Sequence, residues 1–370
     1  MHKNTTATAP QDNWTTRNPP HNTASKKDPN LKIIQLNING LARKIEEIKI
    51  KIQEHKADIV SIQETKLTNK AKTPTIEGFT AVRQDRKHKT GGGLIIYIKN
   101  DIPFSTINIP NTIQQEAIEL QLIKIHLSNK KLLHLANLYI APRDSSNPHH
   151  HQMDTLIQDC FIYLFSKPNL IITADINAYH TMWHSPITDH HGTIIAYIIE
   201  NSTQAVLNGE APTRIPTDRG QQPTSPDITT AISRHITWKT ELANSDHQAI
   251  IINMNTKSNF RLQQNRRTYT NYRKADWIKF KEEIESSLQD IATPNNIHLA
   301  NKTITDLILN ADKHHIPKVK IKPNMKLLPE DIRLQIQERN QVRTINRTDP
   351  QLPELNRQID KSIQDHKTAL

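Results

Sequence analysis

Short runs of β-branched and other apolar residues recur through the first two thirds of the chain, and they constrain its fold more than any other feature. Each run has the length of a β-strand. The runs lie between residues 31 and 255 and read LKIIQLNI, ADIVSIQ, GGGLIIYIK, AIELQLIKIHL, KLLHLANLYI, NLIITAD, DITTAI and HQAIIINM. Segments with helical spacing lie between some of them: KIEEIKIKIQEH, MDTLIQDCFIYLF and TIIAYIIENSTQ. This order predicts a mixed α/β sandwich with sheets in the middle and helices outside.

Composition and the pattern of apolar residues divide the 370 residues into three parts. Residues 1–30 are rich in Asn, Thr, Pro and Lys without apolar periodicity, which predicts a disordered lead-in. Residues 31–255 contain the strand-like runs and predict one globular domain. Residues 256–370 are charged and rich in Gln and Asn, and segments such as DWIKFKEEIESSLQDI and EDIRLQIQERNQVR predict a helical C-terminal extension. Since only 35% of residues are apolar, the composition supports one sizeable core but not two equally rich ones.

The formal net charge of +11 is unevenly distributed. Lys and Arg exceed Asp and Glu by 2 in residues 1–30, by 2 in 31–255 and by 7 in 256–370. Most of the basic excess therefore lies outside the expected globular domain. A surplus of this kind is compatible with a polyanionic partner such as nucleic acid, although many basic segments bind nothing specific.

The single cysteine, Cys160, excludes an intramolecular disulfide and any zinc cluster built on cysteines. Its apolar neighbours predict a packed position in a helix. No apolar run approaches the roughly 20 residues that span a bilayer, and the N-terminus lacks the apolar stretch of a signal peptide. We therefore expect an intracellular protein of the nucleus or cytoplasm that is not secreted and has no membrane partner.

Polar side chains stand at the ends of six of the expected strands. Alternation along a strand points residues i and i+2 to the same face, so Asp175 and Asn177 in ADINAYH should emerge together. The other such residues are Asn37 and Asn39 in LNING, Glu64 in QETK, Tyr139 in NLY, Asp227 in SPDI, and Asp246 and His247 in SDHQAI.

Each of these residues alone is typical of a solvated strand end or a turn. Together they provide carboxylates, amides and an imidazole, which are the groups that hold a hard divalent cation and a phosphate. Mg²⁺ prefers oxygen ligands and keeps several waters, so one or two carboxylates suffice to anchor it. An imidazole beside an acid can be oriented by that acid and can donate to a phosphoryl oxygen.

The ordered series LNING, QETK, GGG, NLY, ADINAYH, SPDI and SDH resembles the endonuclease/exonuclease/phosphatase superfamily. Within it, the chain is most similar to the apurinic-type endonuclease domain of jockey-like non-LTR retrotransposons. The segments ADINAYHTMWHSP, HGTIIAYIIENSTQAVLNGEAPT and LLPEDIRLQIQERNQVR carry that similarity, and it spans about residues 31 to 340. The resemblance implies a four-layer α/β (α+β) sandwich, with two packed mixed β-sheets flanked by helices.

The resemblance also implies roles for individual residues. Glu64 would be the principal ligand of Mg²⁺ or Mn²⁺, with Asn37 nearby and Asp246 completing the metal environment. Asp175 would align or deprotonate the attacking water, and Asn177 would hold that water or the phosphate. His247 would bind the scissile phosphate, Asp227 would orient the His247 ring, and Tyr139 would contact the phosphate. The basic segment before the glycines, with Arg83, Arg86, Lys87 and Lys89, would contact the DNA backbone.

The implied function is a Mg²⁺-dependent endonuclease that nicks double-stranded DNA by phosphodiester hydrolysis and leaves a 3′-OH primer for reverse transcription. No YADD or FADD polymerase motif occurs in the chain, so residues 256–370 would be a basic linker before a missing reverse transcriptase domain. Element RNA would be bound through that missing region. A phosphatase of the same superfamily and a non-enzymatic nucleic-acid-binding remnant of a mobile element remain alternatives.

Two further features favour ordinary structural roles. The run 149–151 of three histidines follows Asn-Pro and predicts a solvated loop, although a metal-binding tract is conceivable. The glycines at 91–93 lack a following Lys-Ser/Thr and predict a turn into a strand instead of a phosphate-binding loop.

Overall fold

A computed structural model describes residues 30–86, 91–113, 117–127, 131–143, 150–216, 220–232, 236–256, 268–289, 291, 296–320 and 328–369. Two six-stranded sheets form its centre, and both are mixed. Sheet A contains β1 (Asn30–Asn37), β2 (Ile59–Gln63), β3 (Phe79–Gln84), β4 (Leu94–Lys99), β11 (Ile236–Glu241) and β12 (Ala249–Asn255), in the order β11-β12-β1-β2-β4-β3.

Sheet B contains β5 (Phe104–Thr106), β6 (Ile118–His126), β7 (Leu132–Ile140), β8 (Leu170–Asp175), β9 (Ala205–Val206) and β10 (Asp227–Ala231). Its order is β5-β6-β7-β8-β10-β9. β1 runs parallel to β2 and β7 runs parallel to β8, whereas the remaining pairings are antiparallel. The carboxyl ends of the parallel strands and the amino ends of β10 and β12 therefore meet at one edge of the sandwich.

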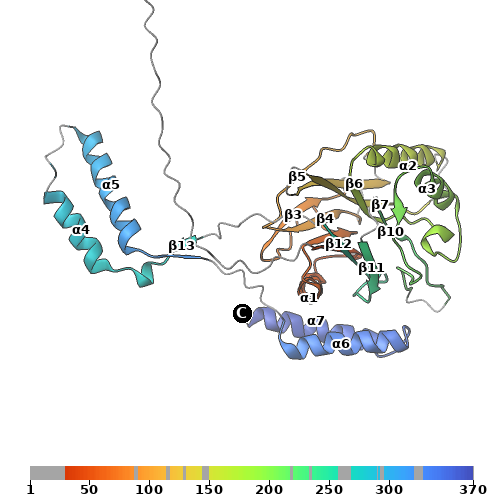
Figure 1. The fold of residues 1–370 in the computed structure, drawn as a ribbon. Coiled ribbons are helices and arrows are strands. Elements are labelled where there is room, and N and C mark those ends of the chain that lie inside the picture. The colour runs from red at the N-terminus through yellow and green to blue at the C-terminus, as the bar shows by residue number, and fades with distance from the viewer. Residues whose placement is uncertain are drawn as a thin grey trace, which may run out of the picture.

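Helices cover the outer faces of both sheets, which gives four layers (Figure 1). The apolar face of α1 (Ile45–His55) packs on sheet A through Ile45, Ile48 and Ile52. Helices α2 (His150–Phe165) and α3 (His190–Glu200) pack on sheet B in a second apolar cluster, and a third cluster fills the space between the sheets. The short 3₁₀ turn η2 (Thr181–Trp183) precedes α3. The four-layer prediction is confirmed.

A buried polar network also joins the two sheets. The Gln63 amide donates to Asn137 over 2.7 Å, and the hydroxyls of Ser61 and Thr173 lie 2.7 Å apart. Gln35 donates to the Ala174 carbonyl over 2.9 Å. Buried hydrogen bonds require specific partners and specific distances, so this network fixes how the sheets are placed relative to each other.

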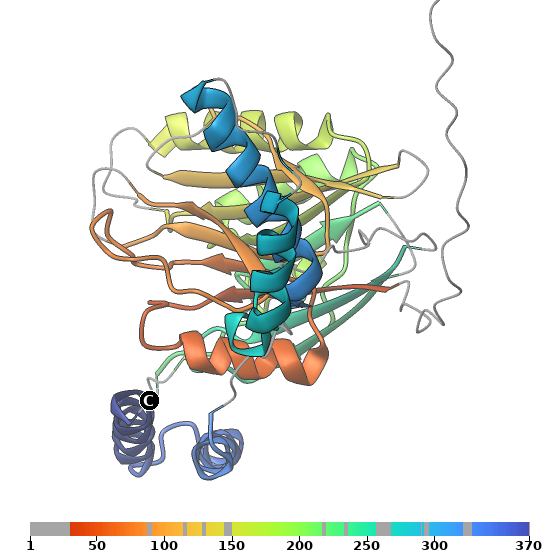
Figure 2. The same ribbon diagram turned by 90° about the vertical axis from the view of Figure 1, so that its left-hand side faces the viewer.

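The C-terminal region is helical apart from one short strand pair. It contains β13 (Thr268–Thr270), η3 (Tyr272–Lys274), α4 (Trp277–Gln289), α5 (Ile297–His315), β14 (Lys318–Lys320), α6 (Glu330–Ile345) and α7 (Leu352–Thr368). β13 pairs with β14, which corrects the expectation that strands end at residue 255. Helices α6 and α7 form a hairpin beside α1 (Figures 1 and 2).

Most expected elements are present within one or two residues of their predicted bounds. β3, β5, β9 and β11 were not predicted. The run of histidines was predicted as a loop, but residues 150 and 151 begin α2, and His149 lies outside the described residues. The glycines at 91–93 precede β4 as expected, whereas the 128–130 turn and the 1–29 lead-in lie outside the described residues. Within the described part of the chain, no helix combines the length and apolarity needed to cross a membrane.

Candidate active site

The polar strand ends of the two sheets converge at one edge of the sandwich. In sheet B, the register places Asp175 opposite Tyr139 of β7 on one side and opposite Asp227 of β10 on the other. Directly opposed residues on neighbouring strands have Cβ atoms roughly 5 Å apart. Sheet A contributes Asn37 at the end of β1, Glu64 directly after β2 and His247 just before β12. The site is therefore divided between both sheets.

Asn37 links the carboxylates of the two sheets. Its amide nitrogen donates to Oδ2 of Asp175 over 2.7 Å and to Oε1 of Glu64 over 3.2 Å. Its amide oxygen accepts the backbone N–H of Asn39 over 3.0 Å. Because all three contacts use the end of a buried side chain, the Asn37 amide has a fixed orientation and holds the two carboxylates near each other.

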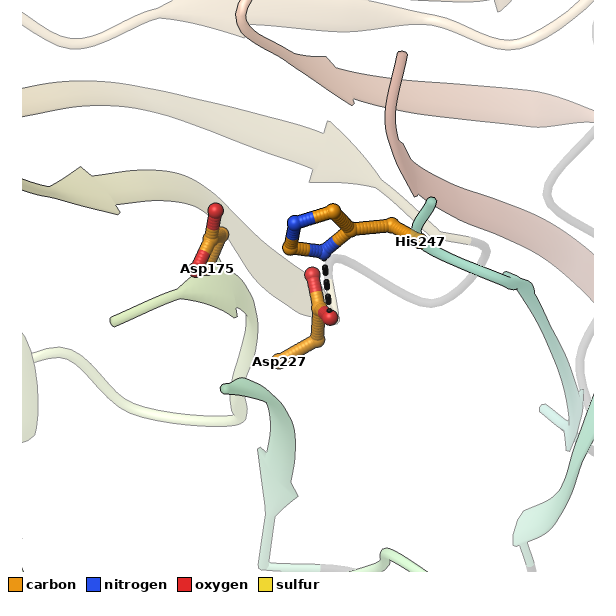
Figure 3. Close-up of side chains that lie close together, drawn as sticks. All are labelled: Asp175, Asp227 and His247. Atoms are coloured by element: carbon orange, nitrogen blue, oxygen red, sulfur yellow. Dashed lines mark hydrogen bonds and ion pairs between the residues drawn. The ribbon is translucent and has the colours of Figure 1, made fainter. Parts of the chain in front are cut away.

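His247 is held by an acid from the other sheet (Figure 3). Its Nδ1 lies 2.8 Å from Oδ2 of Asp227, and the Thr213 hydroxyl donates to the same oxygen over 2.7 Å. Burial alone would lower the pKa of His247, but the Asp227 carboxylate and the hydrogen bond to it raise that pKa to about 9. The imidazole is therefore cationic at neutral pH.

Asp175 is fully buried and lies close to like charge. Burial and the neighbouring Asp227 carboxylate raise its pKa, while His247 and the hydrogen bond from Asn37 act in the opposite direction. Its Oδ1 accepts the backbone N–H of Asn177 over 3.2 Å. The repulsion between the buried carboxylates of Asp175 and Asp227 is unfavourable for folding. Pairs of buried like charges of this kind are concentrated at functional sites.

One residue just after each of three strands has a left-handed backbone conformation. The φ angles are 48° at Asn39, 51° at Glu64 and 43° at Asn177. Left-handed backbone is unfavourable for a non-glycine residue such as Glu64 and requires support from its surroundings. The glycine turn provides that support, since the N–H groups of Thr65 and Lys66 donate to the carbonyls of Gly93 and Gly92 over 3.0 and 2.8 Å.

A cleft of about 510 Å³ lies over this edge, and Asn37, Asn39, Glu64, Asn177, Asp246 and His247 line it. Asp246 is partly exposed in the cleft and pairs with Arg214 over 2.9 Å. Burial alone would raise the pKa of Asp246, but His247 and Arg214 hold it below its usual range. The cleft therefore contains both carboxylate oxygens and cationic donors.

The cleft also contains residues that the sequence did not single out. Arg143, Tyr179 and Arg214 line it, and the Thr213 hydroxyl donates to the Asp227 carboxylate. Thr213 and Arg214 belong to a loop that is hydrogen-bonded to the SDHQ segment. The backbone N–H of Gln248 donates to the Thr213 carbonyl over 2.6 Å, and the backbone N–H of Ile215 donates to the Asp246 carbonyl over 2.7 Å. This loop has no strand-like or helical pattern, so only its contacts reveal its role.

The predicted basic segment does not present free guanidinium groups to the cleft. Arg83 donates to both carboxylate oxygens of Asp85 over 2.7 Å and to backbone carbonyls. Arg86 pairs with Glu119 and lies over the Tyr139 ring, 5.4 Å from its centroid. These two arginines are thus engaged within the protein, and Lys87 and Lys89 lie outside the described residues.

Tyr139 stays protonated in this environment. It is almost entirely buried, and burial together with the nearby Glu64 and Asp175 carboxylates raises its pKa, against the effect of Arg86. A neutral phenol on the strand beside Asp175 can donate a hydrogen bond and does not act as a base.

The ligand atoms at this edge fit a divalent metal ion. One potential ligand atom from each of Asp175, Asp227 and His247 lies within 4.8 Å of the others. While the His247 ring is cationic, its second nitrogen, on the side that faces Asp175 (Figure 3), carries a proton and donates, so the carboxylates and not His247 provide the ligand atoms. Glu64 and Asp246 add oxygen atoms that are open to the cleft. A set dominated by carboxylate oxygens suits a hard cation.

Known proteins share both this fold and its sequence pattern. The family model described as "Endonuclease-reverse transcriptase" matches residues 133–251. The catalytic domain of Xenopus laevis APE2 is 18% identical with a TM-score of 0.51, and the match covers 64% of this chain and 94% of that domain. The endonuclease domain of TRAS1, a telomere-specific non-LTR retrotransposon, is 20% identical with a TM-score of 0.47, and the match covers 63% and 100% of the two chains.

Residues 133–251 thus match an endonuclease-reverse transcriptase family, and the chain has the fold of the APE2 catalytic domain. The chain is also similar to a protein of a mobile element. The probable RNA-directed DNA polymerase from transposon BS of Drosophila melanogaster is 23% identical over 291 residues. That match covers 76% of this chain but only 30% of the relative, so the chain spans about a third of the length of the curated protein that it matches.

Proposed function

We propose that this protein is a Mg²⁺-dependent endonuclease that nicks double-stranded DNA and leaves a 3′-OH end, which primes reverse transcription of a retrotransposon. The observation that carries this proposal is the convergence of Glu64, Asp175 and His247 at one edge of the sandwich, where Glu64 and His247 line the cleft and the buried Asp175 lies close to His247. These residues come from different sheets and are far apart in sequence, yet Asn37 and Asp227 hold them together through hydrogen bonds of 2.7 to 3.2 Å.

His247 would bind the scissile phosphate. Its cationic ring is oriented by Asp227, so Nε2 can donate to a phosphoryl oxygen and stabilise negative charge that grows in the transition state. Tyr139, which remains protonated, would donate to the same phosphate.

Asp175 would align and deprotonate the attacking water. A carboxylate whose pKa is raised is a stronger base near neutral pH than an ordinary aspartate. Asn37 and the backbone N–H of Asn177 fix both oxygens of Asp175. One N–H of the Asn177 amide is used by the Ile140 carbonyl, which leaves its side-chain oxygen to accept from the water.

Glu64 and Asp246 would hold the metal. Their oxygens line the cleft, and the amide oxygen of Asn37 retains one lone pair beside its contact with Asn39. When bound, Mg²⁺ supplies Lewis-acid stabilisation of the phosphate and orients it. Asn37 thus has two roles, as a potential ligand and as the link between Glu64 and Asp175.

The decisive experiment is incubation of the purified protein with supercoiled plasmid, in Mg²⁺ and in EDTA. We expect nicked circles with Mg²⁺, none with EDTA, and none with His247→Ala or Glu64→Ala at unchanged circular dichroism. His134→Ala is a suitable control, because His134 lies on β7 with its ring bonded to the Pro168 carbonyl, outside the cleft. Mg²⁺-dependent nicking by His247→Ala would refute the assignment, and release of phosphate from a phosphoinositide without plasmid nicking would favour the phosphatase alternative.

A further inference from the structure

The α6–α7 hairpin is docked firmly on the nuclease domain. An apolar cluster joins the two helices to Ile50 of α1, and it contains Leu328, Ile332, Ile336, Ile359 and Ile363. The guanidinium of Arg339, only 2% exposed, forms a two-point contact with the Glu47 carboxylate over 3.1 and 2.9 Å. The predicted linker thus forms part of the domain surface next to the active site.

A groove of about 800 Å³ lies between this hairpin and the loops at the active-site edge. Asn39, Arg214 and Asp246 line both the groove and the active-site cleft. Because the two depressions share these residues, a ligand held in the cleft can continue directly into the groove. The hairpin forms the outer wall of the groove, since Arg339, Arg343, Arg347 and Asn356 line it.

Two cations in the groove are held only by neutral acceptors. The Lys44 ammonium donates to the carbonyls of Ile38 and Asn39 over 2.7 and 3.2 Å. The Arg343 guanidinium donates to the carbonyl of Ala243 over 2.6 Å and to that of Ser245. Among the residues that the structure describes, neither cation forms an ion pair with a carboxylate. Arg343 is buried and Lys44 is half-buried. Removing a charge from water without a partner of opposite sign is unfavourable, so both positions favour an added anion, Arg343 the more strongly.

A third cation, Arg347, is exposed where α6 leads into α7 and has no ion pair within the described part of the chain. The remaining arginines of the groove are already neutralised, Arg214 by Asp246 and Arg339 by Glu47. The one further acid in the lining, Asp349, accepts the backbone N–H of Gln351 over 2.9 Å. The groove therefore keeps an excess of positive charge.

We propose that this groove binds the phosphate backbone of a DNA duplex beyond the nicked phosphate, with Lys44, Arg343 and Arg347 as the contacting cations. This inference rests on the proposed function, because the groove opens into the cleft that would hold the scissile phosphate. A backbone with regularly spaced phosphates suits cations distributed along a groove, whereas a single phosphate ester would occupy the cleft alone. The C-terminal hairpin thus enlarges the DNA footprint of the nuclease.

The test measures binding without cleavage. Fluorescence anisotropy with a labelled DNA duplex in EDTA would compare the wild-type protein with Arg347→Glu, Lys44→Met and the matched control Arg357→Glu. Arg357 lies on the same hairpin, but its side chain is 75% exposed outside the groove and pairs with Glu354. We expect Arg347→Glu to weaken binding by roughly tenfold and to lower the slope of log K against log salt by about 1, as loss of one phosphate contact predicts. Lys44→Met should behave similarly, and Arg357→Glu should not.

Equal affinity and equal salt slope for Arg347→Glu and Arg357→Glu would overturn the inference. Equally tight binding of an RNA duplex, lost in the same variants, would overturn the assignment to DNA. The binding readout is independent of nicking: groove-dependent DNA binding by a protein that nicks no plasmid would refute the proposed function alone. Nicking with no effect of the groove variants would refute this inference alone.

Discussion

Oδ2 of Asp227 accepts a hydrogen bond from Nδ1 of His247 over 2.8 Å, and this contact joins the first residue of β10 in sheet B to the segment that precedes β12 in sheet A. Both side chains are buried. The contact supplies the negative charge that keeps the His247 ring cationic, and it also fixes the rotation of that ring.

Replacing this carboxylate by an amide should impair nicking. Asp227→Asn keeps the size of the side chain but removes the charge that raises the pKa of His247, so the phosphate would meet a neutral, less well oriented ring. We expect the plasmid-nicking rate at pH 7 to fall by roughly 100-fold or more. Asp154→Asn, on α2, is the control with the same chemical change away from the cleft. A wild-type rate for Asp227→Asn would show that the contact has no catalytic importance.

Asp175→Asn should raise the stability of the protein but lower its nicking activity. The substitution removes the repulsion between two opposed buried carboxylates and retains one oxygen that can accept from Asn37, while the hydrogen bond from the Asn177 backbone N–H is lost. In EDTA we expect a stabilisation of about 1 kcal/mol, measured as a higher Tm, together with nicking reduced by at least 100-fold in Mg²⁺. A lower Tm with full activity would contradict both parts of the expectation.

Breaking the buried Glu47–Arg339 pair should release the C-terminal hairpin. Glu47→Ala leaves an almost fully buried guanidinium without its carboxylate, and removing one partner of a buried pair destabilises by roughly 3–5 kcal/mol. We expect trypsin to cleave after Arg339 and Arg343 much faster than in the wild-type protein, followed by mass spectrometry. Glu354→Ala, which removes an exposed pair on α7, should leave the cleavage rate unchanged.

Gly192 at the start of α3 should tolerate no side chain. A Cβ atom there would lie 1.8 Å from the carbonyl oxygen of Tyr179, a backbone atom that cannot move aside alone. Gly192→Ala should lower the Tm by several degrees, corresponding to about 1–3 kcal/mol or more. Gly220→Ala provides the control, since nothing lies within 4 Å of a Cβ built at that position. Equal Tm values for both variants would refute the expected clash.

His191 should make the protein sensitive to acid. Its ring is 1% exposed, and burial lowers its pKa from 6.5, although Asp154 and Asp189 act in the opposite direction and Arg143 and His190 reinforce the burial. In the unfolded chain His191 therefore binds a proton at a higher pH than in the folded chain. The free energy of unfolding falls as the pH drops below 6.5, because protonation of His191 then favours the unfolded state. His191→Leu should flatten the dependence of Tm on pH between 6.5 and 5 more than the exposed control His190→Gln. An unchanged acid slope in His191→Leu would contradict this assignment.

The strands and the polar residues at their ends could be predicted, because apolar runs and alternation are local properties of the sequence. Asn37, Glu64, Asp175 and His247 were identified in this way. The edge strands β3 and β11 were missed because neither contains a run of buried apolar residues. β11 largely alternates half-buried and exposed residues, as in ITWKTE, and β3 has no fully buried residue.

The contacts between the sheets could not be read from local pattern. Asn37 and Asp175 are separated by 138 residues, and only the packed structure shows that they share a hydrogen bond. The same holds for Arg339 and Arg343, which lie in a charged helix that resembles a solvated one. Their spacing of four residues places both on one face of α6, but the sequence does not show that this face meets α1.

The division of the cleft between the two sheets has a consequence for the newly made chain. A folding intermediate with sheet A alone would contain Glu64 and His247 but lack Asp175. An intermediate with sheet B alone would contain Asp175 but lack Glu64 and His247. Under the proposed function, neither species could cut a strand, so incompletely folded copies would have no hydrolytic activity, which would arise only when the two sheets pack together.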